Sequence, residues 1–477
     1  MRFSIIVLLS FLACSCAQKA KKPVNVIWLL VEDLSPDLGY NGNQLVKTPN
    51  IDALANAGVS YTNTFATGAV CTPSRTAFAT GMYQTAIDAH QMRYPEHLKN
   101  ELPAKVIPLN ELMRRQGYQT ANIKAKGYGT GKTDWSFKSD KSHFDFSKWE
   151  EIDANKPFFA VVNFKQTHRG FSQDKVNPVN PDDVKVPVYY PDVAPVRQDW
   201  SDYYETIQSL DKLVGKALAD IKKRGLDKNT VICFFSDHGR PMTRAKMFNY
   251  DSGLKVPMII KCPENHELNS VFKPKTEDGQ LISLIDLTAT TLQLAGGDVP
   301  EWMQGQSFID PKVKQREAVF SASDIIGGSM LKTRSVRTSK FRYNRNFNHN
   351  ISVNGAATAY RKANHPIYHA LELVNEAGRL TKEQKQLLEP LPEEELYDVE
   401  NDPYEVHNLA KDEKYKAIMH DMRSRLESWQ KETTDYGMQS DSEELLKAFE
   451  NYRNKSAAQY QKRSNALRKK VQKQLQQ

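Results

Sequence analysis

The chain has 477 residues, of which 26% are charged and 40% hydrophobic, and its formal net charge is +8. This length allows two domains with a sizeable buried core. The charge favours an anionic substrate, but Lys and Arg are spread along the chain and form no single-sign patch of the kind that binds nucleic acid. With five cysteines, two of them within the first sixteen residues, the chain is not a disulfide scaffold.

The first 23 residues have the pattern of an export signal followed by a basic tether. Arg2 precedes an apolar run at residues 3–12, which is too short to span a bilayer as a mature helix. Phe11-Leu12-Ala13-Cys14 is similar to a bacterial lipoprotein processing site, so Cys14, ahead of Cys16, is the candidate for lipidation. We expect an exported protein, a periplasmic or cell-surface lipoprotein of a bacterium that meets the membrane through its lipid only. A plain cleaved signal is the alternative.

A continuous apolar run at residues 24–31 predicts a strand buried on both faces of a parallel sheet. It ends at Glu32 and Asp33, and ligands bind at the carboxyl ends of strands in open α/β sheets. Carboxylates here could cap the next turn or hold a divalent cation. A capped helix is predicted at residues 48–55 and a strand at residues 59–65.

The segment Val70-Cys71-Thr72-Pro73-Ser74-Arg75 follows that strand. Pro73 and Ser74 predict the start of a helix just after Cys71, and a helix N-terminus offers unpaired N–H groups to an anion. Arg75 adds a guanidinium suited to a tetrahedral oxyanion. On composition alone, Cys71 is either a thiol nucleophile or a small buried residue.

Cys-x-Pro-Ser-Arg at residues 71–75, followed by Thr80-Gly81, resembles the signature of the type I sulfatases. In that family the cysteine becomes formylglycine (3-oxoalanine), whose hydrated aldehyde is the nucleophile. The resemblance implies this modification at Cys71, made by a formylglycine-generating or anaerobic sulfatase-maturating enzyme. It also implies an α/β fold, an alkaline-phosphatase-like sandwich. A large mostly parallel sheet would be flanked by helices, and a smaller C-terminal subdomain would contain an antiparallel sheet.

The same resemblance implies a metal site. The family's paired Asp-Asp appears here as Glu32-Asp33, so Asp33 is the safer ligand. Asp237-His238-Gly239 ends a strand predicted at residues 230–236 and matches the family's Asp-Asn-Gly or Asp-His-Gly. It implies Asp237 as a ligand and His238 as a ligand or a hydrogen-bond donor to the nucleophile. The expected metal ligands are thus Glu32, Asp33, Cys71, Asp237 and His238, and Ca²⁺ is favoured because the ligands are rich in oxygen.

A helix is predicted at residues 109–116 and a strand at residues 118–123. Beyond them, Lys132 and Asp134 stand where the family has a Lys-x-His pair. Lys132 fits the lysine that holds the sulfate, whereas Asp134 replaces the histidine near the leaving oxygen. Lys124 and Lys126 remain alternatives to Lys132, because spacing does not decide among them, and a solvated loop lysine is the plain interpretation.

Five further residues are assigned through the resemblance. His168 follows a buried strand predicted at residues 157–164 and matches the family's histidine, a residue type that moves protons near neutral pH. Lys246 matches the second sulfate-binding cation, and Arg244 is a neighbouring substrate contact. His90 and Arg93 lie where the family often grips its substrate, although lone His and Arg residues are usually solvated.

The rest of the chain predicts a surface loop at residues 186–199, a long helix at 202–224 and a late helix near 283–290. From about residue 331, alternating residues predict antiparallel strands and a helix packed on them. We divide the chain into a signal and tether (1–23), an N-terminal catalytic domain (24–330), a C-terminal α+β subdomain (331–435) and a basic helical tail (436–477). The tail's thin apolar stripe (Leu467, Val471 and Leu475) predicts a docked or solvated helix, with membrane or polyanion contact as an alternative.

The resemblance implies hydrolysis of a sulfate ester. Arg75, Lys132 and Lys246 would neutralise the sulfate oxygens as charge develops. A hydroxyl of the hydrated formylglycine, with Asp237 as its base, would attack sulfur and expel the alcohol. His168 or His238 would then take the proton of the second hydroxyl as sulfate leaves.

Within the family, residues 334–347 and Glu395-Leu396-Tyr397-Asp398 are similar to the sulfamidase-like and bacterial polysaccharide sulfatases. The expected substrate is a sulfated glycan, such as an algal polysaccharide of the ulvan or carrageenan type or a glycosaminoglycan oligosaccharide. N-sulfoglucosamine sulfohydrolase (sulfamidase) activity is the alternative. Two further alternatives are a phosphodiesterase of the same superfold, against which Cys71 argues, and a non-catalytic glycan-binding lipoprotein.

Overall fold

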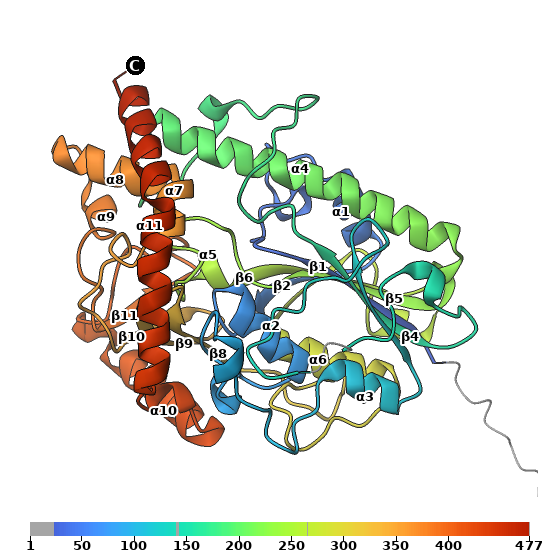
Figure 1. Ribbon diagram of the computed structural model, residues 1–477. Helices are drawn as coiled ribbons and strands as arrows, with labels where there is room; N and C mark the ends of the chain where they lie inside the picture. Colours follow the sequence, from blue (N-terminus) through green and yellow to red (C-terminus); the bar gives the residue numbers. More distant parts are fainter. Residues whose placement is uncertain (1–22, 140–142, 265, 477) are drawn as a thin grey trace, which may run out of the picture.

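Figure 1 shows a computed structural model that describes residues 23–139, 143–264 and 266–476. The predicted lipidation site at Cys14 and the signal lie outside these residues. Within them, the strands form a seven-stranded sheet and a separate four-stranded sheet. No helix in the described ranges has both the length and the apolar composition needed to cross a bilayer.

The larger sheet has the strand order β3-β4-β1-β5-β6-β2-β7. It is mostly parallel, and β6 is the strand that runs antiparallel to both of its neighbours. β1 lies near the centre of the sheet, and all of its residues are buried. This is expected of a largely apolar strand that is covered on both faces. The strands are β1 (Asn25–Val31), β2 (Val59–Phe65), β3 (Gln119–Lys124), β4 (Phe158–Phe164), β5 (Thr230–Ser236), β6 (Lys255–Lys261) and β7 (Thr276–Ser283).

Helices cover both faces of this sheet (Figure 1), with α1 and α4 on one face and α2, α3 and α6 on the other. Successive side chains of β1 point to opposite faces. Ile27 and Leu29 therefore join the core under α4, whereas Trp28 and Leu30 join the core on the other face. The expected α/β fold, with a large mostly parallel sheet flanked by helices, is confirmed.

The α-helices are α1 (Pro49–Asn56), α2 (Cys71–Thr80), α3 (Leu109–Arg115), α4 (Ala194–Lys223), α5 (Asp251–Leu254), α6 (Leu284–Leu294), α7 (Ala359–Asn364), α8 (Pro366–Glu376), α9 (Lys382–Lys385), α10 (Lys416–Thr433) and α11 (Glu443–Gln474). Short 3-10 helices lie at Gly39–Asn41, Gln84–Ile87, Glu96–Leu98, Trp149–Glu151, Pro181–Asp183, Leu226–Asn229, Glu267–Ser270, Glu413–Tyr415 and Tyr436–Met438.

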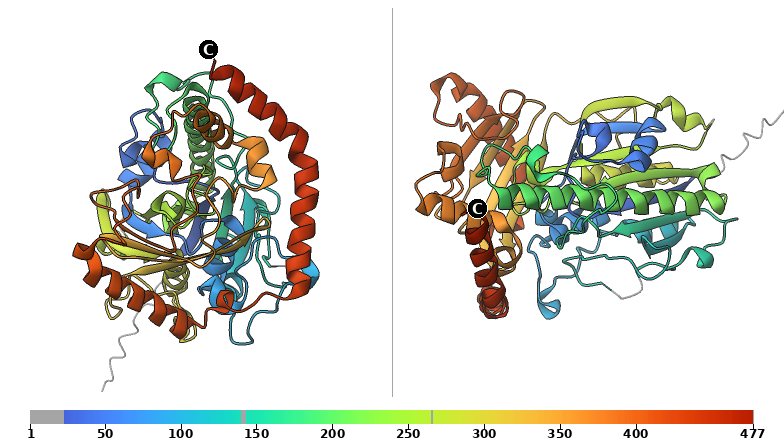
Figure 2. Two further views of the ribbon diagram at one scale, coloured as in Figure 1. Left: turned by 90° about the vertical axis from the view of Figure 1, so that its left-hand side faces the viewer. Right: turned by 90° about the horizontal axis from the view of Figure 1, so that it is seen from above.

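The smaller sheet is antiparallel and beside the larger one (Figure 2), with the strand order β11-β10-β9-β8. Its strands are β8 (Val319–Ile326), β9 (Ser329–Arg337), β10 (Phe341–Asn346) and β11 (Glu394–Asp398). The expected C-terminal antiparallel sheet is thus present. It already includes β8, so the second sheet begins before residue 331.

The start of α4 differs from the sequence-based expectation. The helix begins at Ala194 rather than at Asp202, and Tyr189 and Tyr190 just before it are buried. The prediction of a surface loop at residues 186–199 is therefore wrong for much of that stretch. The proline content suggested a loop, but proline is compatible with the first turn of a helix, and Pro195 occupies that position.

The helix α11 is docked on the rest of the molecule. The sequence predicted either a docked or a solvated helix, and the first of these is found. It packs along α7 and α8, and Figure 2 shows it along one side of the molecule. Val471 is fully buried, and Leu467 is partly buried against the same core. Arg468 lies 2.7 Å from carboxylate oxygens of Glu372 and of Glu376 on α8. The apolar stripe of the tail is therefore used in packing.

Candidate active site

The predicted catalytic residues gather where β1, β4 and β5 end. Val31 is in register with Phe164 on one side and with Ser236 on the other, so the residues that follow the three strands are neighbours. Asp33 has a φ of 54°, which is uncommon for a non-glycine residue. Its N–H donates a hydrogen bond to Oδ1 of Asp237 at 3.0 Å.

Asp33, Asp237 and His238 form a buried group whose candidate ligand atoms all lie within 4.8 Å of one another. Nδ1 of His238 lies 2.9 Å from the carbonyl oxygen of Gly239, and a proton on Nδ1 would donate to it. Nε2 lies 2.9 Å from Asp33 Oδ1, yet this buried nitrogen has no well-formed hydrogen bond. Two carboxylates and an unsatisfied imidazole nitrogen are a donor set that fits a divalent cation.

The charges in this group are strongly coupled. Burial alone would raise the pKa of Asp33, but Lys246, His238 and His168 hold it well below its usual value. Burial would lower the pKa of His238, but Asp237 and Asp33 raise it to about 9. The pKa of Asp237 is also lowered, because His238 and Arg75 outweigh its burial. Asp237 is consequently a weak base and suits a ligand role better than the base role expected from the sequence.

Cys71 is the first residue of α2 and is 4% exposed. The helix begins at Cys71 itself rather than after it, with Val70 as the extended residue before it. The thiol lies close to the side chain of Asp134 and helps to lower the pKa of that carboxyl group. The ammonium groups of Lys132 and Lys246 are both close enough to interact electrostatically with Cys71. Any anion that forms at this position therefore faces two cations and a helix N-terminus.

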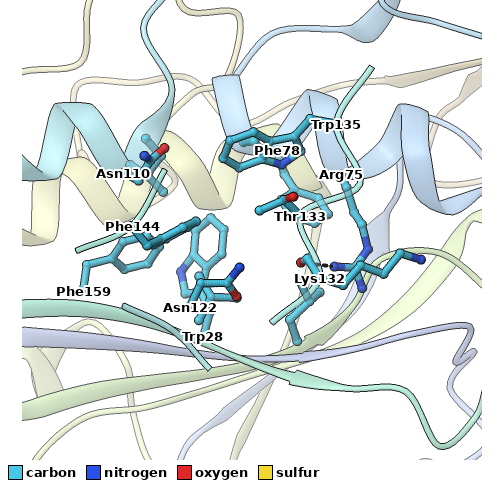
Figure 3. A pocket seen from close by; sticks show the side chains of 14 residues that line it. Trp28, Arg75, Phe78, Asn110, Asn122, Lys132, Thr133, Trp135, Phe144 and Phe159 are labelled. Carbon is cyan, nitrogen blue, oxygen red and sulfur yellow. Dashed lines mark hydrogen bonds between the residues drawn. The ribbon is translucent and has the colours of Figure 1, made fainter. Parts of the chain in front are cut away.

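Arg75, one turn into α2, connects the ends of the strands. Nε donates to Asp237 Oδ2 at 2.8 Å, and Nη1 donates to Asn163 Oδ1 at 3.0 Å and to the Lys132 carbonyl oxygen at 3.1 Å. Figure 3 shows Arg75 and Lys132 beside a small cavity. Its volume is about 30 Å³, and it is lined mainly by apolar side chains, of which Trp28, Phe78, Trp135, Phe144 and Phe159 are aromatic. These apolar neighbours strengthen the electrostatic interactions of the guanidinium.

Of the three candidate lysines, Lys132 is the one that interacts electrostatically with Cys71. Nζ lies 2.7 Å from Glu32 Oε1 and 3.2 Å from Asp134 Oδ2. Lys124 and Lys126 are exposed. Burial would raise the pKa of Asp134, but Lys132 and Arg75 lower it to about 2, so that this carboxylate is ionised at neutral pH.

Glu32 is not a member of the Asp33, Asp237 and His238 group in the part of the chain that the structure describes. Its carboxylate is 3.5 Å from Arg75 Nη2 and is held more closely by Lys132. The backbone turns after β1, so the neighbouring carboxylates of Glu32 and Asp33 contact different groups. The expectation of Glu32 as a metal ligand is not reflected in these contacts.

His168 lies on the edge of a separate, larger cavity of about 900 Å³, which Glu32, Lys132 and Asn163 also line. Its Nδ1 is 3.0 Å from the Arg169 carbonyl oxygen. The His168 ring interacts electrostatically with Asp33. The structure thus brings His168 together with the other predicted residues.

Three predicted substrate contacts have other partners. Arg244 is buried, its guanidinium lies 3.7 Å from the ring centroid of Tyr250, and it donates to the Tyr404 carbonyl oxygen at 2.9 Å. His90 lies 3.6 Å from an Asp88 carboxylate oxygen. Arg93 is over the ring of Tyr452 in α11, 5.9 Å from its centroid. None of these contacts, all among described residues, is with the group around Cys71.

Three polar residues near the site were not singled out from the sequence. The first is Asn163, and its position at the end of β4 is a signal that could have identified it. Its side chain accepts a hydrogen bond from Arg75 and donates one to Asn122 Oδ1 at 2.7 Å. Arg361 and His365 come from α7 and the residue after it, and carry no motif. Arg361 interacts electrostatically with Lys246, and His365 with Lys246 and Asp33.

Arg361 and His365 are both buried. The Nη1 atom of Arg361 and the Nδ1 atom of His365 have no hydrogen-bond partner, and the Arg361 side chain has no ion pair within the described ranges. Burial, with Arg169 and Arg361 nearby, holds the pKa of His365 well below its usual value, so this imidazole is neutral. A buried guanidinium without a counter-charge is costly unless an anion binds it.

Comparison with known proteins places these residues in a family context. Residues 24–297 match the family model described as Sulfatase. An ulvan-active sulfatase of Formosa agariphila is 33% identical over 457 residues, which cover 85% of this chain and 74% of that protein. The N-sulphoglucosamine sulphohydrolase of Homo sapiens is 26% identical over 471 residues, covering 87% of this chain and 91% of that protein.

The fold is also similar to solved structures. A protein solved in complex with its substrate, D-glucosamine-2-N,6-O-disulfate, has a TM-score of 0.64 at 17% identity. The match covers 88% of this chain and 100% of that chain. At this level of identity the likeness concerns the fold.

Proposed function

This chain belongs to the sulfatase family and is a sulfuric ester hydrolase of sulfated glycans, and on that premise we propose that it acts through a formylglycine formed at Cys71. The observation that carries the proposal is the position of Cys71. It is the first residue of a buried helix N-terminus, and both Lys132 and Lys246 are close enough to interact electrostatically with it. The hydrate of a formylglycine there supplies the hydroxyl that attacks sulfur while the S–O bond to the alcohol breaks. Loss of the proton from the second hydroxyl then breaks the C–O bond to sulfate and restores the aldehyde.

The cations of the site hold and polarise the sulfate. Lys132 and Lys246 both lie near Cys71, and each has a carboxylate partner that fixes its direction. Arg75 is fixed by four contacts with Asp237, Asn163, Lys132 and Glu32, so its role is to orient the ends of the strands. Cations already in place need no reorganisation as negative charge grows on the sulfate oxygens.

Asp33, Asp237 and His238 would hold the cation, and their carboxylate oxygens favour Ca²⁺. When bound, such an ion polarises the sulfate and makes a nearby hydroxyl more acidic. Glu32 is not assigned as a metal ligand, because its carboxylate is paired with Lys132 and Arg75. Asp134 is ionised and cannot protonate the leaving oxygen, so proton transfer falls to His168, which is at the cavity edge.

The named relatives support the substrate class. The 33% identical protein is described as ulvan-active, which favours a sulfated algal polysaccharide of the ulvan type. Similarity to N-sulphoglucosamine sulphohydrolase over 91% of that protein makes N-sulfated glucosamine the second candidate. A carrageenan-type substrate is the third. We further propose that the protein is exported, is lipidated at Cys14, and is matured by a formylglycine-generating or anaerobic sulfatase-maturating enzyme.

The test is release of inorganic sulfate from size-defined oligosaccharides. The full chain, produced together with a maturating enzyme, is incubated with ulvan, carrageenan and heparan-type oligosaccharides. We expect release from ulvan fragments, and none from the folded Cys71→Ala variant. Peptide mass spectrometry at Cys71 should show replacement of the thiol by an aldehyde. Turnover by a protein whose Cys71 is unmodified, or by Cys71→Ala, would overturn the mechanism.

A further inference from the structure

The cavity of about 900 Å³ extends well beyond the residues assigned to the reaction. It opens at the carboxyl ends of β3 and β4, and Glu32, Lys132, Asn163 and His168 form part of its lining. Its size is at the upper end of the range for ligand pockets in proteins. Room is therefore available next to the reacting sulfate for another part of the substrate.

Three lysines line the same cavity and have no part in the reaction described above: Lys124, Lys126 and Lys165. Each is exposed, and among the described residues none of them is within ion-pair distance of a carboxylate. Lys126 lies over the ring of Tyr128, 4.0 Å from its centroid. We refer to Lys124, Lys126 and Lys165 as the lysine cleft.

The positive charge of the lysine cleft is not compensated by its surroundings. Among the described residues that line the cavity, Glu32 alone is acidic. Its carboxylate is already paired with Lys132 and Arg75. Arg169, another lining residue, is paired with Asp199 at 2.6 Å. The cleft is therefore a cationic surface that an anion could bind without first breaking an ion pair.

We propose that the lysine cleft binds a second anionic group, a sulfate or a uronate carboxylate, on a sugar that adjoins the one being desulfated. The proposal rests on the proposed function, because it takes the end of the cavity at Lys132 and His168 as the reacting end. It deepens that function by assigning an oligomeric polyanion, rather than a sulfated monosaccharide, as the preferred substrate. Since the lysines are exposed, their contribution should weaken as salt rises.

The test compares two matched variants. One carries Lys124→Gln, Lys126→Gln and Lys165→Gln. The control carries Lys156→Gln, Lys223→Gln and Lys228→Gln, which removes the same charge from exposed lysines at the opposite, amino-terminal edge of the sheet. For each, kcat/KM is measured with a sulfated monosaccharide and with oligosaccharides whose neighbouring sugar carries a sulfate, a uronate or no charge.

In the cleft variant we expect the preference for charged oligosaccharides over the monosaccharide to fall about tenfold at low ionic strength, mainly through KM. The loss should shrink at higher salt and be absent in the control. Comparison of the sulfate and uronate arms identifies the group that the cleft binds. An unchanged preference, or an equal loss with the uncharged neighbour, would overturn the proposal.

Binding separates this inference from the proposed function. Calorimetric titration of oligosaccharides into Cys71→Ala protein, with and without the three cleft substitutions, needs no turnover. Weaker binding caused by the cleft substitutions would support the cleft even if the chemistry proved different. If wild-type protein turns over and the binding is identical with and without the lysines, the cleft is wrong and the sulfatase mechanism stands.

Discussion

Nζ of Lys246 lies 2.8 Å from one carboxylate oxygen of Asp33 and 2.7 Å from the other. Both residues are buried. One ammonium group thus neutralises a candidate metal ligand and also lies near the nucleophile position. The structure ties the charge of the proposed metal site to that of the proposed sulfate site.

The first prediction concerns this pair. Lys246→Met should leave the Asp33 carboxylate buried without its partner and lower the free energy of unfolding of the metal-free protein by about 3–5 kcal/mol. Added Ca²⁺ should restore part of the loss, because it supplies charge to the same carboxylate. Sulfate release should fall by about 10²–10³. Denaturant unfolding with and without Ca²⁺ provides the measurement, and Lys246→Arg is the control that keeps the charge.

The second prediction concerns removal of the cation. A Ca²⁺ chelator should lower both the activity and the thermal midpoint. Free Ca²⁺ at a hundred times its dissociation constant should then raise the free energy of unfolding by about 2.7 kcal/mol. Asp237→Asn should make the midpoint insensitive to Ca²⁺. A wild-type midpoint that does not respond to chelator or to Ca²⁺ would contradict the assignment of the site.

The third prediction concerns the unpaired guanidinium of Arg361. Arg361→Met should raise the thermal midpoint of the free enzyme, because it removes a buried charge without a counter-ion. The same change should raise KM for sulfated substrate, because the cation is then missing when the anion arrives. Arg361→Lys keeps the charge and serves as the control. A variant that is less stable and has an unchanged KM would assign Arg361 to packing alone.

The fourth prediction concerns pH. Burial raises the pKa of Glu405 to about 7, because Arg342 and Arg244 do not fully offset the burial and the nearby Asp251. In the unfolded chain the group titrates near 4.5. Between these pH values the folded state binds the extra proton, so stability should fall as pH rises from about 5 to 8, by about 3 kcal/mol. Glu405→Gln should flatten this dependence, measured by urea unfolding across the range.

Residues at strand ends could be predicted from the sequence. Asp33, His168 and Asp237 each follow an apolar run, and the carboxyl ends of adjacent parallel strands meet at one edge. The choice of Lys132 over Lys124 and Lys126 depended on tertiary structure. The chain passes so close to β3 and β4 at Gly131 that a Cβ there would lie 2.2 Å from Asn122 Oδ1, and this approach directs the next residue toward Arg75.

Other parts of the site could not be predicted, because no local pattern marks them. Arg361 and His365 reach the site through the packing of α7 and α8 against the rest of the molecule. Arg244 is two residues from Lys246 in the sequence. Its guanidinium nevertheless stacks on the ring of Tyr250 and donates a hydrogen bond to the carbonyl oxygen of Tyr404. Proximity in sequence therefore did not indicate which cation is available to substrate.

The packing of α11 against α7 supports the helix that carries Arg361. A protein shortened at residue 435 would keep Cys71, Lys132 and Lys246, but would leave one side of the Arg361 helix exposed to water. Failure of such a shortened protein to bind substrate would therefore be no evidence against the chemistry at Cys71. Helix α11 therefore contributes to the position of Arg361, although it lies far in sequence from Cys71, Lys132 and Lys246.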